Sequence, residues 1–145
     1  MKRILFLLAL LVTAAYTQAQ DEVKWSGSYN QATKQVELKA EIKEGWHLYS
    51  QFIQNDVGPV PTTFSFQSSD DFQLKGAVVE PAAIQKYDPN FEATLNFFEK
   101  EVVFKQHIQP GKASSLEVTV TFMVCNETMC LPPVDQKIKI SIPSK

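Results

Sequence analysis

The chain has 145 residues, of which 44% are hydrophobic and 21% are charged, so it holds enough apolar material for one folded domain and too much for a disordered chain. Its formal net charge is −2, and this mildly acidic composition argues against nucleic acid or an anionic membrane surface as the main partner. With only two cysteines, the chain can form neither a dense disulfide scaffold nor a four-cysteine zinc site.

The N-terminus has the pattern of a secretory signal peptide. A short basic start precedes an unbroken apolar run over residues 4–12, and small residues end at Ala19 before the chain turns polar. A membrane-spanning helix needs about 20 apolar residues, roughly twice the length of this run. We therefore predict a signal peptide over residues 1–19 and one mature domain over residues 20–145. The mature chain is then exported without stable membrane insertion, to a compartment where a cysteine pair can persist as a disulfide.

Most of the mature chain shows the two-residue alternation of half-buried β-strands. The pattern is strict over residues 34–43, and it returns over residues 116–124 and 136–142. Less regular strand candidates cover residues 23–29, 47–52, 62–66, 72–79 and 101–108. No segment shows a convincing helical period. Seven to nine short strands, spaced by roughly ten residues with turn signals between them, predict an all-β protein: an immunoglobulin-like antiparallel β-sandwich.

Two stretches fit this pattern poorly. Residues 55–61 hold one glycine and two prolines, which suits a kinked edge or a crossover between sheets. Residues 85–98 are rich in aromatic side chains but contain the turn sequence Asp88-Pro89-Asn90. Phe91 follows this turn directly, so we expect its ring on or near a loop tip, where an aromatic side chain needs something to cover.

The two cysteines follow a predicted strand. Continuing the alternation of that strand places Val124 inward and Cys125 outward, away from the core. Four residues separate Cys125 from Cys130, which suits a hairpin loop that brings the pair to disulfide distance. Closing a loop of about six residues stabilises a protein by only ~2 kcal/mol, against nearly 5 kcal/mol for about a hundred residues. The pair is poorly placed for stability and well placed for chemistry, so we favour a redox-active disulfide.

Two alternatives remain open. The first is an inert structural disulfide in a non-catalytic immunoglobulin-like binding module. The second is a Cu(I)-binding protein, because four soft sulfur ligands lie close together in the sequence. They belong to Met123, Cys125, Met129 and Cys130. Packing against the hairpin is the simpler explanation for both methionines, and the two histidines are isolated in sequence. We therefore expect no metal and no cofactor.

Three segments carry a family resemblance. They are EGWHLY at residues 44–49, the aromatic segment over residues 87–98, and VCNETMCLPP at residues 124–133. Together they resemble the N-terminal periplasmic domain of the DsbD family of thiol:disulfide interchange proteins. The last segment is the most specific, because an apolar residue and two prolines follow the second cysteine at once. The resemblance spans nearly the whole mature chain.

The resemblance implies an immunoglobulin-like fold with a redox-active disulfide near the ends of its last two strands. It also implies a periplasmic electron relay, which accepts electrons from a thioredoxin-like domain and passes them to periplasmic proteins of thioredoxin fold. Cys130 would then form the mixed disulfide with a partner, and Cys125 would resolve it. The family's membrane-spanning carrier and C-terminal thioredoxin domain are not in this sequence. Either a separate protein supplies the electrons or the domain serves as a binding module, so we leave open its place in a protein-disulfide reductase system.

The resemblance further implies an aromatic residue that caps the disulfide until a partner displaces it. Phe91, in the loop that begins at Asp88, is the candidate, and Phe97 and Phe98 compete with it because this segment is longer than in the family. His47 and Tyr49 fall where the family has aromatic residues that flank the cysteines. The cysteine spacing of four residues also departs from the five of the best-known members.

The surroundings of the cysteines in the sequence contain nothing that activates a thiol. No Lys, Arg or His lies between residues 124 and 134, and Glu127 is acidic. We therefore expect the disulfide of the oxidised domain to be attacked by a thiolate of the partner. We expect the thiols of the reduced domain to react slowly until a partner is bound. We expect this domain to be a monomer.

Overall fold

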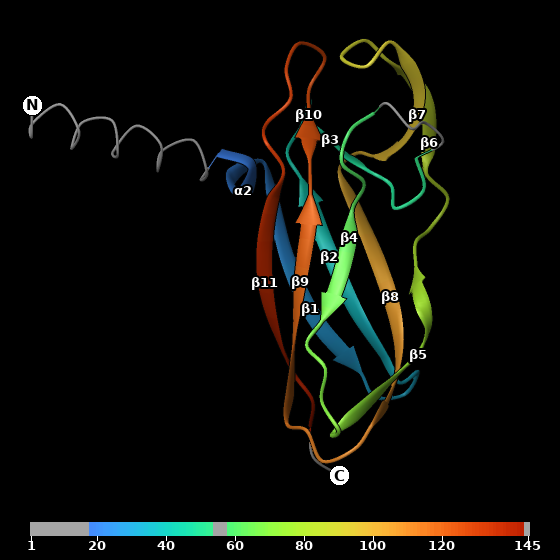
Figure 1. The fold of residues 1–145 in the computed structure, drawn as a ribbon, viewed down its shortest axis with the longest axis vertical. Coiled ribbons are helices and arrows are strands. Elements are labelled where there is room, and N and C mark those ends of the chain that lie inside the picture. Colours follow the sequence, from blue (N-terminus) through green and yellow to red (C-terminus); the bar gives the residue numbers. More distant parts are fainter. Residues whose placement is uncertain (1–17, 54–57, 144–145) are drawn as a thin grey trace, which may run out of the picture.

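The computed structural model describes residues 18–53 and 58–143. Within these ranges, eleven strands form three antiparallel sheets, and a five-residue helix, α2 (Gln18–Glu22), precedes them. The protein is an elongated β-sandwich (Figure 1), which confirms the predicted all-β class. No helix in the described ranges is long and apolar enough to cross a membrane.

The first sheet has four strands in the order β1-β2-β8-β5. Their bounds are Val23–Asn30 for β1, Gln35–Ile42 for β2, Glu101–Pro110 for β8 and Phe72–Val79 for β5. The register pairs Val23 with Ile42 across the first hairpin and Leu38 with Phe104 across β2 and β8. The predicted alternation holds in β2, because its apolar residues are buried and its charged residues are half-buried or exposed.

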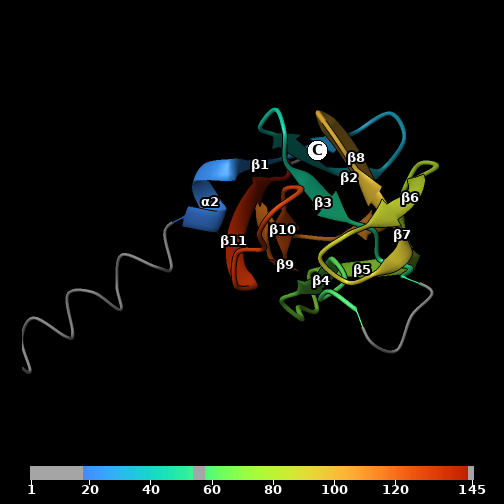
Figure 2. The same cartoon turned by 90° about the horizontal axis from the view of Figure 1, so that it is seen from above.

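A second sheet packs on the first and has three strands in the order β11-β9-β4. Their bounds are Val134–Ser141 for β11, Ser115–Phe122 for β9 and Thr63–Phe66 for β4. Figure 2 shows β1, β2 and β8 facing β9, β11 and β4 as two layers. The main core lies between them, where the ring centroid of Trp25 is 5.8 Å from Phe104 and 5.6 Å from Phe122. Gly27 allows β1 to approach β11 closely, since a Cβ there would lie 2.6 Å from Cγ1 of Ile140.

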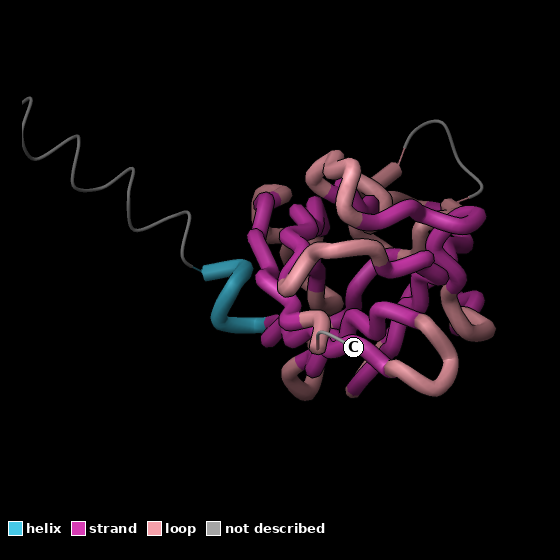
Figure 3. Tube along the Cα trace, turned by 90° about the horizontal axis from the view of Figure 1, so that it is seen from below, coloured by secondary structure: helices cyan, strands magenta, loops and turns pink. Residues whose placement is uncertain are grey.

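The third sheet, in the order β10-β3-β7-β6, lies at one end of the sandwich (Figure 1). Its strands are β10 (Val124–Cys125), β3 (His47–Tyr49), β7 (Ala93–Phe98) and β6 (Ile84–Asp88). One face of this sheet carries Leu48, Phe98 and Val124 into the main core, and the other face carries a second, smaller apolar cluster. The C-terminal end of β11 lies at the opposite end of the molecule (Figures 1 and 3).

The strand predictions differ from the structure in three places. Residues 85–98 fitted no strand pattern, but most of them form the hairpin β6–β7. The pattern of one buried and one exposed face is lost there because β6 is exposed at every residue but Asp88, and because both faces of β7 are buried at its end, at Phe97 and Phe98. The strand predicted over residues 116–124 is interrupted at Met123, where the chain passes from β9 in one sheet to β10 in another. The strand predicted over residues 47–52 ends at Tyr49.

Two further predictions fall wholly or partly outside the described residues. Most of the predicted signal peptide lies in residues 1–17, which the structure does not describe. Its expected end, Ala19, lies within α2 and is buried against the main core. The predicted kink over residues 55–61 is described only from Gly58 onward, and residues 58–61 belong to no strand.

Candidate functional site

The two cysteines form a disulfide at the end of the sandwich that the third sheet occupies. Their Cα atoms lie 4.0 Å apart, and they face each other across an antiparallel bridge. The amide of Leu131 donates a hydrogen bond to the carbonyl of Val124 at 3.0 Å, which continues the pairing past the cysteines. The predicted hairpin loop and its disulfide are therefore present.

The loop between the cysteines is closed from within by Asn126. Its amide donates to the carbonyl of Met129 at 2.9 Å, and its Oδ1 accepts hydrogen bonds from the amides of Thr128 at 2.9 Å and Met129 at 2.8 Å. Asparagine side chains commonly close turns in this way. These hydrogen bonds lie within the loop that connects the two cysteines.

The two cysteines differ in their exposure. Cys125 is fully buried, whereas Cys130 is half-buried at the edge of the second cluster. Cys125 points away from the main core as predicted, but the face that it reaches is not exposed to solvent. The other face of β10 is covered as well. The covering cluster comprises Tyr49, Leu95, Phe97 and Cys125, with Ile53, Phe91, Ala93, Met123 and Cys130 packed against it.

Phe91 lies in the turn between β6 and β7 and packs half-buried on this cluster. Its ring meets the ring of Tyr49 edge-on, with the centroids 6.0 Å apart. The other two candidate caps are placed differently, because Phe97 is an interior member of the cluster and Phe98 faces the main core. Of the three aromatic residues, Phe91 is the one that a movement of a turn could lift away.

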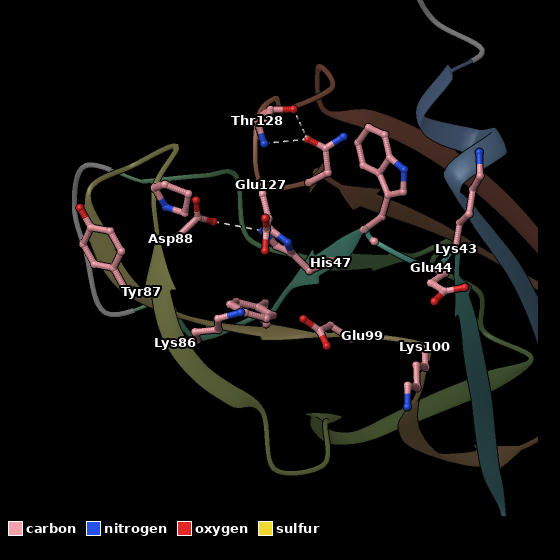
Figure 4. A pocket seen from close by; sticks show the side chains of 15 residues that line it. Lys43, Glu44, His47, Lys86, Tyr87, Asp88, Glu99, Lys100, Glu127 and Thr128 are labelled. Atoms are coloured by element: carbon pink, nitrogen blue, oxygen red, sulfur yellow. Dashed lines mark hydrogen bonds and ion pairs between the residues drawn. The ribbon is translucent and has the colours of Figure 1, made fainter.

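His47, Tyr49 and Asp88 meet in a buried polar group beside the disulfide. The hydroxyl of Tyr49 donates to Oδ2 of Asp88 at 2.5 Å. Nε2 of His47 lies 3.1 Å from the same carboxylate oxygen (Figure 4). It also lies 3.0 Å from the Tyr49 hydroxyl. His47 is also the register partner of Cys125 across β3 and β10. The structure thus brings together the three polar residues that the sequence analysis had singled out separately, next to the buried cysteine.

The ionisation of this polar group is set by burial and by its own hydrogen bonds. Burial lowers the pKa of His47, although the neighbouring Asp88 opposes this, so the imidazole is neutral at pH 7. Burial alone would raise the pKa of Asp88, but hydrogen bonds from Tyr49, the Asn90 amide and His47 hold it below its usual value. Burial and the contact with Asp88 raise the pKa of Tyr49. The group therefore carries a single negative charge at neutral pH.

A groove of about 730 Å³ opens beside this polar group. His47 and Phe97 lie in it, and its walls come from the loop before β3, from β6 and from the cysteine loop (Figure 4). Charges of both signs line it, namely Lys43, Lys86 and Lys100 with Glu44, Glu99 and Glu127. A partner protein would therefore find a recessed, mixed-charge surface next to the disulfide loop.

Sequence reasoning missed one connection at this site. Asn90 donates from its backbone amide and from Nδ2 to Oδ1 of Asp88, at 2.8 and 3.1 Å. Its Nδ2 also donates to the carbonyl of Asn126, in the cysteine loop, at 2.8 Å. In the sequence, Asn90 is an ordinary turn residue, and nothing signals a contact 36 positions away.

The two methionines of the Cu(I) alternative lie in different surroundings. The sulfur of Met123 accepts a hydrogen bond from the amide of Val60 at 3.5 Å, and Met129 is exposed on the cysteine loop. In the described residues, no three His, Cys, Asp or Glu side chains gather in a way that could hold a metal ion.

Comparison with known proteins places the chain among thiol:disulfide interchange domains. The family described as "Thiol:disulfide interchange protein DsbD, N-terminal" matches residues 14–142. The reduced DsbD N-terminal domain of Neisseria meningitidis superposes with a TM-score of 0.64 at 16% identity, covering 86% of this chain and 89% of that one. No curated protein sequence matches the chain significantly.

Two further solved structures share the fold. For the N-terminal periplasmic domain of ScsB from Proteus mirabilis, the TM-score is 0.58 at 16% identity, with coverage of 81% of this chain and 44% of that one. For a complex between the DsbD N-terminal and PilB N-terminal domains of N. meningitidis, the values are 0.55 and 16%, with coverage of 79% and 80%. These superpositions confirm the predicted immunoglobulin-like fold.

Proposed function

Because the chain belongs to the family of N-terminal domains of the thiol:disulfide interchange protein DsbD, we propose that it is a periplasmic electron relay that exchanges its disulfide with proteins of thioredoxin fold. The observation that carries this proposal is the unequal exposure of Cys125 and Cys130. Exchange requires a thiolate to reach one sulfur atom of the disulfide. Cys130 is partly exposed and Cys125 is fully buried. This difference is expected if Cys130 reacts with the partner and Cys125 resolves the mixed disulfide.

The solved relatives support the location and the kind of partner. The ScsB domain is described as periplasmic, and one structure holds the DsbD N-terminal domain together with the PilB N-terminal domain. A protein partner also suits the groove of about 730 Å³ beside the cysteine loop. The thioredoxin fold of the partner is what the family resemblance implies.

The proposed exchange proceeds in two steps. A partner thiolate attacks Sγ of Cys130, which forms an intermolecular disulfide and breaks the Cys125–Cys130 bond. Cys125 leaves as a thiolate and takes up a proton. The second thiol of the partner then loses its proton and attacks the partner's own sulfur in the mixed disulfide, which releases Cys130. Two electrons have then passed to the domain, and the reverse sequence passes them to an acceptor disulfide.

The surroundings of Cys125 disfavour a thiolate at this resolving cysteine in the reduced domain. A thiolate at Cys125 would lie in an apolar cluster, next to a polar group that carries a single negative charge on Asp88. Both features disfavour a second negative charge. Phe91 covers the same cluster from the turn, and we assign it the role of a cap that limits exchange with small thiols.

Trapping of the mixed disulfide tests the proposal. The Cys125→Ala variant keeps Cys130 as its single thiol. It is mixed with a periplasmic thioredoxin-fold protein that has lost its second active-site cysteine and whose remaining cysteine is activated with 5-thio-2-nitrobenzoate. We expect a covalent adduct on non-reducing electrophoresis.

The matched control is Cys130→Ala, whose remaining thiol is buried, and we expect it to form the adduct at least tenfold more slowly. No adduct with Cys125→Ala, or equal rates for the two variants, would contradict the proposed relay.

A further inference from the structure

We propose that Asn90 is a latch that ties the Phe91 turn to the cysteine loop and so sets how fast the disulfide reacts with small thiols. Asn90 does not touch the reacting sulfur atoms in this role. It is a positioning residue that acts through Phe91. The inference rests on the proposed redox function and deepens it, because it assigns the closure of the site to one side chain.

The latch is a single hydrogen bond between two separate loops. Nδ2 of Asn90 donates to the carbonyl of Asn126 at 2.8 Å, and this bond is partly buried. Among the hydrogen bonds of the described residues, it is the one that joins the turn between β6 and β7 to the loop between Cys125 and Cys130. Its acceptor is a backbone carbonyl, so the bond uses no side-chain atom of the cysteine loop.

The other end of the latch is anchored in the buried polar group. Oδ1 of Asp88 accepts hydrogen bonds from the amide and Nδ2 of Asn90, while Oδ2 accepts from Tyr49 and His47. Both carboxylate oxygens are therefore in use, and together they orient the Asn90 carboxamide toward the cysteine loop. A continuous series of hydrogen bonds thus runs from β3, through Asp88 and Asn90, to Asn126.

The position of Asn90 connects this bond to the cap. Phe91 is the next residue, and its ring packs on the cluster that contains Cys125 and Cys130. A movement of the turn that lifts Phe91 from the cluster must also separate Asn90 from the carbonyl of Asn126. One such hydrogen bond shifts an opening equilibrium by about three- to tenfold. Loss of the Asn90 side chain should therefore expose the disulfide more often.

A double-mutant cycle tests the latch. The second-order rate constant for reduction by dithiothreitol is measured for the oxidised wild type, Asn90→Ala, Phe91→Ala and the double variant. We expect Asn90→Ala to react about three- to tenfold faster than the wild type, and Phe91→Ala to react faster as well. Because both substitutions remove the same closure, we expect the double variant to stay within about twofold of Phe91→Ala.

Two further variants separate the latch from a general loss of structure. Asn90→Asp keeps the shape but places a carboxylate against the Asn126 carbonyl and Asp88, so it should react at least as fast as Asn90→Ala. Asn96→Ala is the matched control, because Asn96 also donates from Nδ2 to a distant carbonyl, that of Phe52, at 3.0 Å. It should stay within about twofold of the wild type.

An unchanged rate in Asn90→Ala would overturn the latch, and so would a double variant whose acceleration equals the product of the two single effects. An Asn96→Ala variant as fast as Asn90→Ala would also overturn it. These rates are measured without a partner protein, so they test the latch independently of the mixed-disulfide experiment. If that experiment failed, the proposed electron relay would be rejected, and the effect of Asn90 on reduction by dithiothreitol could still be measured.

Discussion

His47 connects the buried polar group to the pH of the surroundings. Its pKa in the folded chain is lowered from 6.5, mainly by burial, so the unfolded chain binds more protons than the folded chain once the pH drops below that value. Above about pH 6.5, His47 is neutral in both states and does not reduce the free energy of unfolding. As the pH falls from there toward the folded pKa, the unfolded chain takes up a proton at His47 before the folded chain does, and the free energy of unfolding decreases. Asp88 acts in a separate window, because its folded pKa is lowered from 3.8 and its contribution is lost only below that value.

We therefore expect the free energy of unfolding of the oxidised wild type to decrease between about pH 7.5 and pH 5. His47→Gln keeps a hydrogen-bond donor for Asp88 but cannot titrate, so its decrease should be clearly smaller. Urea denaturation at several pH values measures both. The matched control is His107→Gln, which alters the other, exposed histidine and should retain the full decrease. A His47→Gln variant with the same pH dependence as the wild type would contradict this assignment.

At this scale, the sequence pointed to residues that the structure brings together beside the disulfide, but not to the contacts between them. The cysteine pair, the aromatic residue after the Asp88 turn and the flanking His47 and Tyr49 were all predicted from motifs. Asp88 contacts Tyr49 and His47 from 39 and 41 positions away, and Asn90 reaches Asn126 from 36 positions away. Such contacts depend on how the hairpin β6–β7 packs beside β3, which no local pattern reports.

The elements of the fold differ in how much they depend on the disulfide. The cysteine loop is short, and its two ends are already paired by β10 and the bridge that follows, whereas the main core is built by β1, β2, β8, β9 and β11. We expect reduction of the disulfide to lower the free energy of unfolding by about 2 kcal/mol and to leave the sandwich folded. Chemical denaturation of the oxidised and reduced wild type measures the difference.

The matched control for this prediction lies in β2. Leu38 is fully buried in the main core, and Leu38→Ala should cost about 2–5 kcal/mol without touching the disulfide. If reduction alone unfolded the protein, or cost more than Leu38→Ala, the disulfide would be a structural bridge that the fold requires. That outcome would favour the inert binding module over the relay.

Strand patterns predicted the regular elements and failed where a strand does not have one buried and one exposed face. Residues 34–43 and 136–142 alternate strictly because one face of each strand meets the main core and the other meets water. In β7, Leu95 and Phe97 face the second cluster, and the opposite face is buried at Phe98, which enters the main core, but exposed at Thr94. In β6, every residue except Asp88 is exposed. The same second cluster covers Cys125, which explains why extending the strand pattern gave the right direction for its side chain and the wrong exposure.

In the molecule as a whole, the main core and the disulfide lie in different regions. The main core fills the space between the two large sheets, and the disulfide lies in a smaller cluster at one end. Opening of the turn between β6 and β7 would disturb this small cluster and leave the packing of the sandwich in place. The proposed exchange site could therefore open without movement of the elements that form the main core.

The reduction potential of the Cys125–Cys130 pair tests the central claim most directly. The protein is equilibrated in buffers of defined dithiothreitol or glutathione ratio, and the oxidised fraction is counted after alkylation of the free thiols. Structural disulfides lie below about −300 mV, whereas exchanging ones lie above this value. The relay requires a potential above about −300 mV, and a value clearly below it would show that the disulfide is inert and would contradict the account.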